Sequence, residues 1–547
     1  MRYVSWNVLN KLPNDPIAAV LSARNILDKD NFVLPKYENL SNPHDFKFMS
    51  RATARVKKAI SENQIIGLFM DYDADGICGG AIIYRNLRKF VEIEYYVPHR
   101  SEGYGLSKKA INSFAKSDCK LVLTVDCGIK SNEEISYAKS LGIDTIVIDH
   151  HELPDELPDA YAIIHPQVSD KIKFKNLSGG GVAYNFVRAL ELFDGKEKWD
   201  IDLAAISTVA DIVPLVEDNR VIVSYGLNVI AKTRNKGLSE LIKISSLDKT
   251  KVGTYEVGFQ IAPRINATGR IDDPVSSFRL LTSDDESEIA ILCEKLNRLN
   301  LQRQDVLKKD LASVDNAVKL ENKTQDGVIV IKQDGLNEGV VGLVAGKITD
   351  MYYKPSIVLT DHEEFFKGSA RSIKGVNITK IISSASDLLE SFGGHPGAAG
   401  LSLKKENFKR FEERIKKESK IIDKILFDRV LQVDVLIDSS QVNLDLAHSI
   451  EHLEPFGYGN SRPVFALEKM KITSFKTIGK SGDHYKIMLC DSVSNYDCIA
   501  FNVQKNGWKI TDGMIVDVAF TISINRWRDR KKVDLIVEDI KSSSKND

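Results

Sequence analysis

Short apolar runs alternate with longer amphipathic stretches over the first half of the chain. Residues 65–70, 121–125 and 145–148 are mainly apolar and have the length of a buried strand. Stretches with apolar positions at helical spacing, such as 80–90 and 132–141, separate them. Buried strands that alternate with helices are typical of a parallel sheet covered on both faces. The pattern therefore predicts an α/β fold built on a parallel sheet.

The pattern changes along the chain and predicts five segments. Residues 1–60 have apolar positions at helical spacing, which predicts a helical lead-in, and the parallel sheet is expected over 61–283. Residues 284–322 are polar, contain regularly spaced leucines and lack Gly and Pro, so we expect one long connecting helix. A second α/β domain is expected over 323–425 and a small β-barrel over 426–547. The strand-like stretches that predict the barrel are 478–490, 495–503, 515–524 and 533–540.

Composition narrows the class of protein without indicating a substrate. The 547 residues are 43% hydrophobic and 28% charged, which is typical of a folded globular chain. With 75 basic and 76 acidic residues the formal net charge is -1, which neither supports nor excludes a nucleic-acid partner. No apolar run reaches about 18 residues and the N-terminus lacks an apolar signal-peptide core, so we expect no membrane association. The six cysteines lack CxxC spacing, which favours reduced thiols in a cytoplasmic protein.

Acidic and histidine side chains follow each of the three apolar runs. Because the carboxyl ends of parallel strands meet at one edge of a sheet, we expect these side chains to converge. They are Asp71, Asp73, Asp75, Asp126, Asp149, His150 and His151. A further candidate is Asp211, which ends a stretch of small and apolar residues before Pro214.

The expected cluster suits a metal site. Carboxylates brought together repel one another unless a cation neutralises them. Asp oxygens with a His nitrogen suit Mn²⁺ or a similar divalent ion, and this many acids suit two ions about 3.5–4 Å apart. Such ions activate water and stabilise displacement at phosphorus, which predicts metal-assisted phosphoester hydrolysis. Each Asp alone is equally explained as a turn or helix-cap residue, and the His pair alone as structural.

Several of these motifs resemble those of a known superfamily. DYDADG at 71–76, VDCG at 125–128 and DHH at 149–151 resemble the first three motifs of the DHH phosphoesterases. GGHPGAAG at 393–400 resembles the signature of the DHH-associated domain, and the C-terminal part resembles an OB-fold. The resemblance covers nearly the whole chain.

Other segments resemble one branch of that superfamily. PHRSEGYG at 98–105, SGGGVA at 178–183 and APRINATGR at 262–270 are similar to segments of its bacterial exonucleases specific for single-stranded DNA. This branch implies two bound ions, with Mn²⁺ preferred or Mg²⁺ in its place. The implied ligands are Asp73, Asp75, Asp126 as the bridge, His150 and Asp211, with Asp71 as a further ligand. His151 would face the scissile phosphate, and Asp149 would orient the histidines.

Segments rich in Gly, Ser and Arg are the candidates for holding the substrate. Arg binds phosphate through a planar fork, and glycine-rich helix starts bind anions through backbone N–H groups. An isolated Arg is equally explained as a solvated surface residue, and a run of Gly residues as a plain loop. The tryptophan, Trp527, is equally explained as a residue of the barrel core. The candidates are Arg100, Ser178, Gly180, Arg264, Asn266, Arg270, Ser369, Arg371, Gly394, His395 and Trp527. We expect the four arginines to lie in loops.

The branch implies degradation of single-stranded DNA from the 5′ end to mononucleotides, in recombination and repair. A single-strand-binding protein and a RecQ-type helicase are the implied partners of a monomeric chain. One alternative is a DHH-family phosphodiesterase of short oligonucleotides or cyclic dinucleotides, and another is an inorganic pyrophosphatase; both kinds are usually shorter and lack the OB-like part. A third alternative is a replication scaffold with an inactive metal site. Every acid and histidine of the motif set is present here, which disfavours the scaffold.

Overall fold

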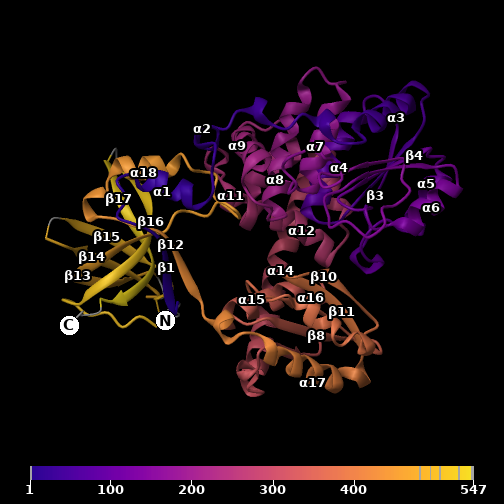
Figure 1. The fold of residues 1–547 in the computed structure, drawn as a ribbon. Helices are drawn as coiled ribbons and strands as arrows, with labels where there is room; N and C mark the ends of the chain where they lie inside the picture. Colours follow the sequence, from indigo (N-terminus) through magenta and orange to yellow (C-terminus); the bar gives the residue numbers. More distant parts are fainter. Residues whose placement is uncertain (1–2, 480–481, 493, 504–506, 528–529, 544–547) are drawn as a thin grey trace. The chain divides into compact units, whose positions relative to one another are not determined.

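The computed structural model describes residues 3–479, 482–492, 494–503, 507–527 and 530–543, and it divides into two compact units (Figure 1). One, which we call the parallel-sheet unit, consists of Asp30–Gln304 with Pro455–Ser461. The other, the β-rich unit, consists of Met1–Lys29, Asp305–Glu454 and Arg462–Asp547. None of the helices in the described ranges is long and apolar enough to cross a membrane.

Five parallel strands form the sheet of the parallel-sheet unit. They are β2 (Ile66–Met70), β3 (Ile93–Tyr96), β4 (Leu121–Val125), β5 (Asp144–Ile148) and β6 (Ala162–Ile164). Their order is β3-β2-β4-β5-β6, and every neighbouring pair is parallel. Met70 pairs with Val125 and Val125 pairs with Ile148, so three of the strands end at the same level. The predicted parallel sheet is confirmed, and its acidic segments share one edge.

Helices cover both faces of this sheet, which explains why its strands are continuous apolar runs. On one face lie α3 (Met49–Ser61), α4 (Ala74–Leu87), α7 (Gly179–Leu190) and α8 (Ile201–Ala210), and on the other lie α5 (Lys108–Lys116) and α6 (Asn132–Ser140). Successive side chains of a strand point to opposite faces. Leu68 and Leu123 accordingly pack in the first core, whereas Phe69 and Val122 pack in the second.

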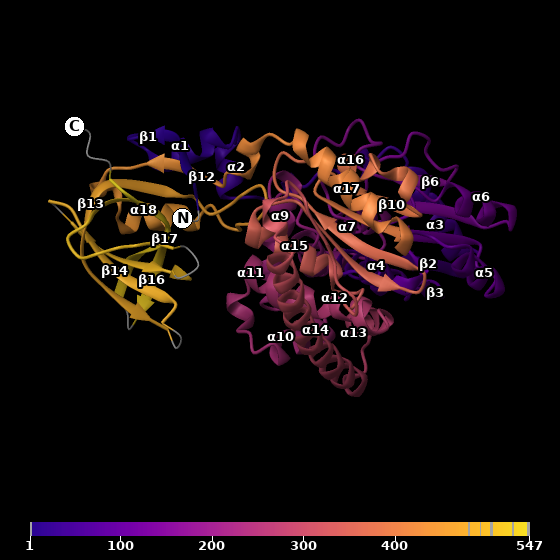
Figure 2. The ribbon, with the colours of Figure 1, turned by 90° about the horizontal axis from the view of Figure 1, so that it is seen from below.

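A long helix follows the other helices around this unit. Those helices are α2 (Lys29–Val33), α9 (Glu217–Ile230), α10 (Lys236–Ile244), α11 (Thr254–Glu256), α12 (Ala262–Ile271) and α13 (Val275–Thr282). Next comes α14 (Glu286–Leu320), an unbroken helix of 35 residues (Figure 2). Leu292 and Leu296 pack in the core of the parallel-sheet unit, and Val314 and Val318 pack in a core of the β-rich unit. The long connecting helix is confirmed.

The β-rich unit contains a mixed sheet that follows α14. Its strands are β7 (Ile329–Lys332), β8 (Ser356–His362), β9 (Phe365–Arg371), β10 (Ser391–His395) and β11 (Ala398–Lys404). Their order is β10-β11-β9-β8-β7, with β7 and β8 parallel and the other neighbours antiparallel. Its helices are α15 (Val341–Tyr352), α16 (Ile378–Ser383) and α17 (Phe408–Glu418). This sheet with its helices is the expected second α/β domain.

The C-terminal part forms the expected barrel. Its strands are β13 (Phe465–Ile478), β14 (His484–Cys490), β15 (Asn495–Ala500), β16 (Ile515–Trp527) and β17 (Arg530–Ser542). Before them in the chain come β12 (Val430–Leu436), which pairs with β13 outside the closed ring, and α18 (Leu444–Glu451). Strand β13 pairs with both β14 and β16, which closes the barrel. The prediction missed β12 and most of β13, because it took only the strands after residue 478 from the alternation of the sequence.

The N-terminal segment is not wholly helical, which differs from our prediction. Residues Ser5–Lys11 form a strand, β1, which pairs in parallel with β12, and the helix α1 (Pro16–Ala23) follows it. Trp6 and Val8 pack against Leu431 and Val433 of β12. A seven-residue strand gives a weak signal at the end of a chain, and the stronger helical spacing further along outweighed it.

Candidate metal centre

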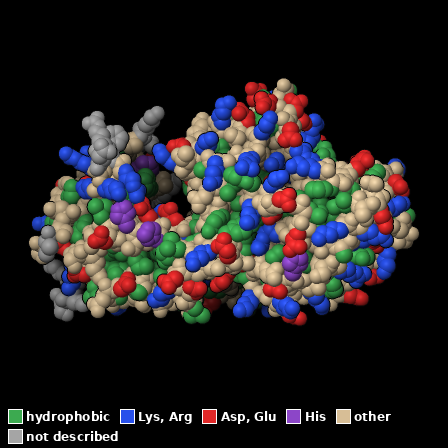
Figure 3. All heavy atoms as spheres, turned by 90° about the horizontal axis from the view of Figure 1, so that it is seen from above, with side chains coloured by type: hydrophobic (Ala, Val, Ile, Leu, Met, Phe, Trp, Pro, Cys, Tyr) green, Lys and Arg blue, Asp and Glu red, His purple; other side chains and the backbone are tan. Residues whose placement is uncertain are grey.

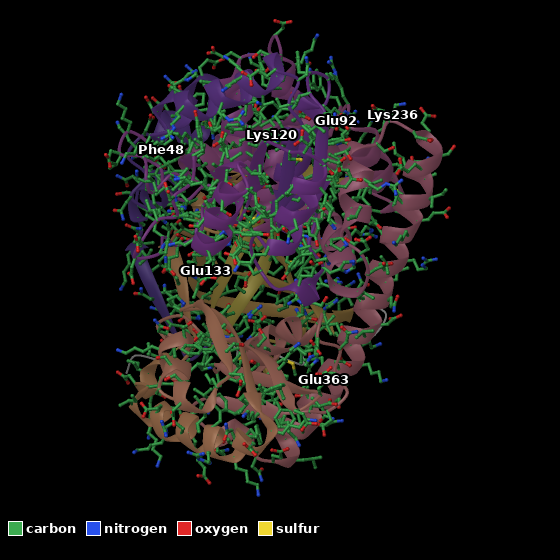
Figure 4. The ribbon with its side chains drawn as sticks, turned by 90° about the vertical axis from the view of Figure 1, so that its right-hand side faces the viewer. Phe48, Glu92, Lys120, Glu133, Lys236 and Glu363 are labelled. Atoms are coloured by element: carbon green, nitrogen blue, oxygen red, sulfur yellow. The ribbon has the colours of Figure 1, made fainter. Side chains whose placement is uncertain are left out.

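The acidic segments meet at the carboxyl edge of the parallel sheet. Figure 4 marks the two edges, because Lys120 directly precedes β4 and Glu133 lies in the first turn of α6, which follows β4. Three groups of side chains beyond the strand ends each place one ligand atom per residue within 4.8 Å of one another. The groups are Asp71 with Asp73 and Asp126, Asp75 with His150 and Asp211, and Asp126 with His150 and His151. The structure thus brings these residues together, as their positions after the strands led us to expect.

Asp126 belongs to two of the three groups. Its Oδ1 atom lies 3.1 Å from Nε2 of His150 and 3.7 Å from Nδ1 of His151. The same Nε2 lies 3.6 Å from Oδ2 of Asp75 and 3.7 Å from Oδ2 of Asp211. The φ angle of Asp126 is +60°, a conformation that Asp and Asn adopt more readily than other non-glycine residues. Such strain at a buried carboxylate is typical of functional sites.

The donor set fits a divalent cation. Oδ1 of Asp126, Nε2 of His150 and Oδ1 of Asp71 are buried and lack a hydrogen-bond partner among the described residues. A buried polar atom without a partner is costly, and a bound cation supplies the missing interaction. Carboxylate oxygens combined with imidazole nitrogens suit Mn²⁺, and the oxygens alone suit Mg²⁺.

The carboxyl groups of the cluster hold protons more tightly than usual. Burial, followed by the charges of Asp75 and Asp73, raises the pKa of Asp126 well above its ordinary range. Burial and the same two neighbours raise the pKa of Asp211 to about 9. Burial lowers the pKa of His150, which keeps the imidazole neutral and able to bind a metal. A cation entering this cluster therefore displaces protons from the carboxyl groups.

Asp149 is placed to orient the histidines. Its Oδ1 accepts hydrogen bonds from the backbone N–H groups of His150 (2.7 Å) and His151 (3.1 Å), and it lies 2.8 Å from Nδ1 of His151. Its Oδ2 accepts from the N–H of Ile129 at 3.0 Å. Burial alone would raise the pKa of Asp149, but the hydrogen bond from His151 and the charges of both histidines bring it below its ordinary value. Asp149 is thus a charged carboxylate that fixes the loop carrying both histidines.

The glycine-rich start of α7 binds a carboxylate of the protein itself. The N–H groups of Gly179 and Gly180 donate to the two oxygens of Asp75 at 2.8 and 2.7 Å, and the hydroxyl of Ser207 donates to Oδ1 at 2.5 Å. The hydroxyl of Ser178 caps the helix by accepting from Gly181. Ser178 and Gly180 are buried and have partners within the protein, and their role as phosphate contacts stays a prediction. In this structure the N–H groups of Gly179 and Gly180 hold the Asp75 carboxylate in the metal centre.

Replacing Gly180 by Ala should weaken metal binding. An added Cβ would lie 2.4 Å from Oγ of Ser207 and 3.4 Å from Oδ1 of Asp75, so it would displace a donor of that carboxylate. Loss of a hydrogen bond behind a metal ligand costs about 10- to 100-fold in metal affinity. The control is Gly181→Ala, whose Cβ would lie no closer than 3.2 Å to a neighbour. The melting temperature of each variant, measured at increasing Mn²⁺ concentration, checks this prediction. If both variants need the same Mn²⁺ concentration for half of the full stabilisation, the prediction is contradicted.

The three candidate arginines of the parallel-sheet unit lie in helical segments and not in loops. Arg264 and Arg270 belong to α12, and Arg100 begins a short 3₁₀ turn, so the expected loop positions are wrong for these three. The guanidinium of Arg100 lies 5.7 Å from the ring centre of Tyr72, next to the acidic turn. Burial, followed by the charges of Arg100 and Arg303, lowers the pKa of Arg270 to about 10. These side chains form a positively charged flank of the cluster.

Asn266 has a structural partner. Its Oδ1 accepts a hydrogen bond from the N–H of Ala74 at 2.7 Å. Asp73 caps the start of α4 by accepting from the N–H groups of Asp75 and Gly76 at 2.9 and 3.2 Å. Asn266 therefore holds the turn that carries the first acidic motif.

Tyr104 is a site residue that the prediction missed. Its hydroxyl donates to the backbone oxygen of Asp126 at 2.9 Å and lies 3.0 Å from Nδ1 of His151. Tyr104 belongs to the PHRSEGYG segment, from which only Arg100 had been selected. Periodicity gives no sign of such a residue, because it reaches the site from a loop.

The remaining candidates belong to the β-rich unit. Ser369 and Arg371 lie on β9, which ends at Arg371. Gly394 and His395 lie on β10. Strand β11 separates β9 from β10 in one sheet, and Nη1 of Arg371 donates to Oγ of Ser369 at 2.9 Å. The side chain of Trp527, at the end of β16, lies outside the described residues.

The fold and the metal-ligand cluster define a DHH phosphoesterase. The model of the DHH family, N-terminal domain, matches residues 65–213, which contain the parallel sheet and the ligand residues. The DHHA1 domain matches residues 325–420, and the RecJ OB domain matches residues 433–539. The structure is similar to the crystal structure of RecJ in complex with Mn²⁺ from Thermus thermophilus, with a TM-score of 0.85, 27% identity and coverage of 98% of this chain and 79% of that one.

The chain belongs to the RecJ family. It is 31% identical to the single-stranded-DNA-specific exonuclease RecJ of Salmonella typhimurium, with 88% of each chain covered. It is 30% identical to the protein of the same name from Escherichia coli, with 90% of each chain covered. It is 37% identical to that of Bacillus subtilis over 93% of this chain, but it spans only 65% of that relative.

Proposed function

We propose that this chain is an exonuclease that hydrolyses single-stranded DNA from the 5′ end to mononucleotides. It acts with two divalent ions, Mn²⁺ or Mg²⁺, in recombination and repair. The observation that carries the proposal is the cluster around Asp126 and His150, with three buried atoms that lack partners among the described residues. The family supports the substrate, because its members are named for single-stranded DNA.

Different residues would bind the ions, donate a proton or a hydrogen bond to the scissile phosphate, and position that donor. Asp73, Asp75, Asp126, His150 and Asp211 would hold the ions, with Asp126 shared and Asp71 as a further ligand. When bound, the ions supply an activated water and neutralise charge on the phosphate. His151 stands ready to donate a proton or a hydrogen bond, since Asp149 raises its pKa against the opposing effect of burial. Tyr104 limits the movement of that imidazole through its hydroxyl group.

Positive charge beside the cluster suits the phosphates of a strand. Arg100 and Arg270 flank Asp73, and Arg264 lies on the same helix as Arg270. Over the face drawn in Figure 3, basic and acidic side chains are interspersed, and the formal net charge of the chain is -1. Ser369, Arg371, Gly394, His395 and Trp527 of the β-rich unit remain the proposed contacts to more distant nucleotides.

The experiment that tests the function uses one oligonucleotide labelled at its 5′ or its 3′ end, with Mn²⁺. Immediate release of a labelled mononucleotide from the 5′ end, from single-stranded DNA but not from duplex or RNA, is the expected result. Release first from the 3′ end would overturn the direction. Turnover of dinucleotides with no cleavage of the long strand would favour the alternative phosphodiesterase of short substrates, and no metal-dependent hydrolysis at all would favour the scaffold.

Association and location stay predictions. A single-strand-binding protein and a RecQ-type helicase are the proposed partners, and we propose a monomeric, cytoplasmic enzyme. Sedimentation of the purified chain, alone and with each partner, checks the partners and the monomeric state.

A further inference from the structure

Two aromatic rings are exposed side by side on the parallel-sheet unit. Tyr255 lies in α11, and Phe259 lies in the single π-helical turn that follows it, Val257–Ile261. Their exposed fractions are 63% and 68%, and their ring centres are 4.8 Å apart with an angle of 31° between the planes. Val257 and Ile261 of the same turn are fully buried. The turn is therefore fixed to the core, while Phe259 within it and Tyr255 before it are exposed.

The segment that carries the rings packs on α8, the helix that leads to Asp211. Gly258, between them, packs on α8: a Cβ placed on it would lie 3.6 Å from Cγ1 of Val209, two residues before Asp211. The residue after Asp211, Ile212, is itself 68% exposed. The hydroxyl of Thr254 donates to the backbone oxygen of Phe456 at 2.6 Å, which ties the start of the turn to its unit. The segment between the two rings thus packs on the helix that leads to Asp211, a proposed metal ligand.

Two arginines neighbour the π-helical turn that carries Phe259. Arg264, on α12, donates from Nη1 to the backbone oxygen of Gln260 at 2.7 Å, the residue after Phe259. Burial and the charge of Arg264 lower the pKa of Arg303. The Nε atom of Arg303 is buried and lacks a hydrogen-bond partner among the described residues. Two neighbouring guanidinium groups concentrate positive charge, which suits an anion such as a phosphate.

We propose that Tyr255 and Phe259 form a stacking platform for a base of single-stranded DNA, with Arg264 and Arg303 beside an adjoining phosphate. The proposal rests on the proposed function and adds a subsite to it. Exposed aromatic rings next to cations and a metal site suit a nucleotide chain, whose bases present flat faces and whose backbone presents anions. A purely apolar partner would not use the positive charge of the two arginines. π-Helical turns are rare and are often found at functional sites.

The test compares binding of two fluorescent strands in EDTA, where no cleavage occurs. One is an oligothymidylate, and the other is an abasic strand of the same length. The Tyr255→Ala/Phe259→Ala double variant should bind the oligothymidylate about 5- to 150-fold more weakly than the unchanged protein, the range for loss of one stacked base. On the abasic strand the two proteins should bind equally, because no base is there to stack. The variant Tyr255→Phe should bind as the unchanged protein does.

The control is Phe90→Ala, which truncates another partly exposed ring of the same unit. It should leave both affinities unchanged. If the double variant binds both strands equally more weakly, or both as tightly as the unchanged protein, the platform is overturned. A lowered melting midpoint with unchanged binding would also overturn it, because it would mean that the rings pack within the protein. Hydrolysis by the unchanged protein is measured in parallel with Mn²⁺. If the unchanged protein cuts single strands and the double variant binds them equally well, only the proposed platform is wrong. If the unchanged protein neither binds nor cuts single strands, the proposed function is wrong as well.

Discussion

The variant Asp126→Asn should hydrolyse single-stranded DNA about 10²- to 10³-fold more slowly, the size of effect seen when one strong electrostatic contact to a transition state is removed. Asp126 occurs in two of the three potential ligand groups, and its Oδ1 lies 3.1 Å from Nε2 of His150. An amide keeps the volume of the side chain but loses its charge. Initial rates on an end-labelled strand at saturating Mn²⁺ check this result.

The same change should leave the metal-free protein as stable as before, or more stable. Burial and the neighbouring acids raise the pKa of Asp126, so its carboxylate is an unfavourable group in the folded state when no cation is present. Melting in EDTA should therefore occur at an equal or higher temperature, while the stabilisation by Mn²⁺ should shrink. A simple loss of folding would lower the midpoint in EDTA as well and would contradict this account.

The backbone at Asp126 decides which substitution to use. Its φ of +60° is tolerated by Asn but strained for Ala, so Asp126→Ala mixes a backbone effect with the loss of the ligand. Asp118 offers a matched control, because it is an aspartate with a φ of +56° in an exposed turn of the same unit. Asp118→Asn should change neither the rate nor the effect of metal. A comparable loss of activity in that variant would remove the special role of Asp126.

Strand ends were the most informative feature of the sequence. The strands β2, β4 and β5 are buried on both faces, so each is a continuous apolar run, and the acid that follows it is conspicuous. Parallel pairing then dictates that these acids meet, which is why Asp71, Asp126 and Asp149 were placed together without coordinates. Topology, more than any single motif, made the metal centre predictable.

Other parts of the site depend on contacts that no local pattern contains. The start of α7 has the composition of a phosphate cradle, but its N–H groups bind Asp75, which lies about a hundred residues earlier in the chain. Tyr104 reaches Asp126 and His151 from a loop. Strand β1 gains its place from pairing with β12, more than four hundred residues away. The local sequence gives the residue types at these positions, but it does not show which distant residues they contact.

Removing the metal should make the stability of the protein depend strongly on pH. In the folded state, burial and mutual repulsion raise the pKa of Asp71, Asp73 and Asp126, and that of Asp211 to about 9. The folded chain therefore binds more protons than the unfolded chain at neutral pH. Because their pKa values are raised, these groups favour the folded state at low pH, and that contribution is lost as pH rises towards about 9. The free energy of unfolding in EDTA should fall over this range.

Bound metal should offset this dependence. Each proton that a cation displaces makes its apparent binding stronger by up to about 1.4 kcal/mol per pH unit, until the carboxyl group is fully ionised. At about 100 times its dissociation constant, one cation stabilises the folded state by about 2.7 kcal/mol. Melting with saturating Mg²⁺ and with EDTA, at about pH 7 and about pH 9, measures the difference, which should be larger at the higher pH. In Asp211→Asn the fall in EDTA should be shallower than in Asp118→Asn; equal slopes in the two variants would show that the cluster does not hold the extra protons.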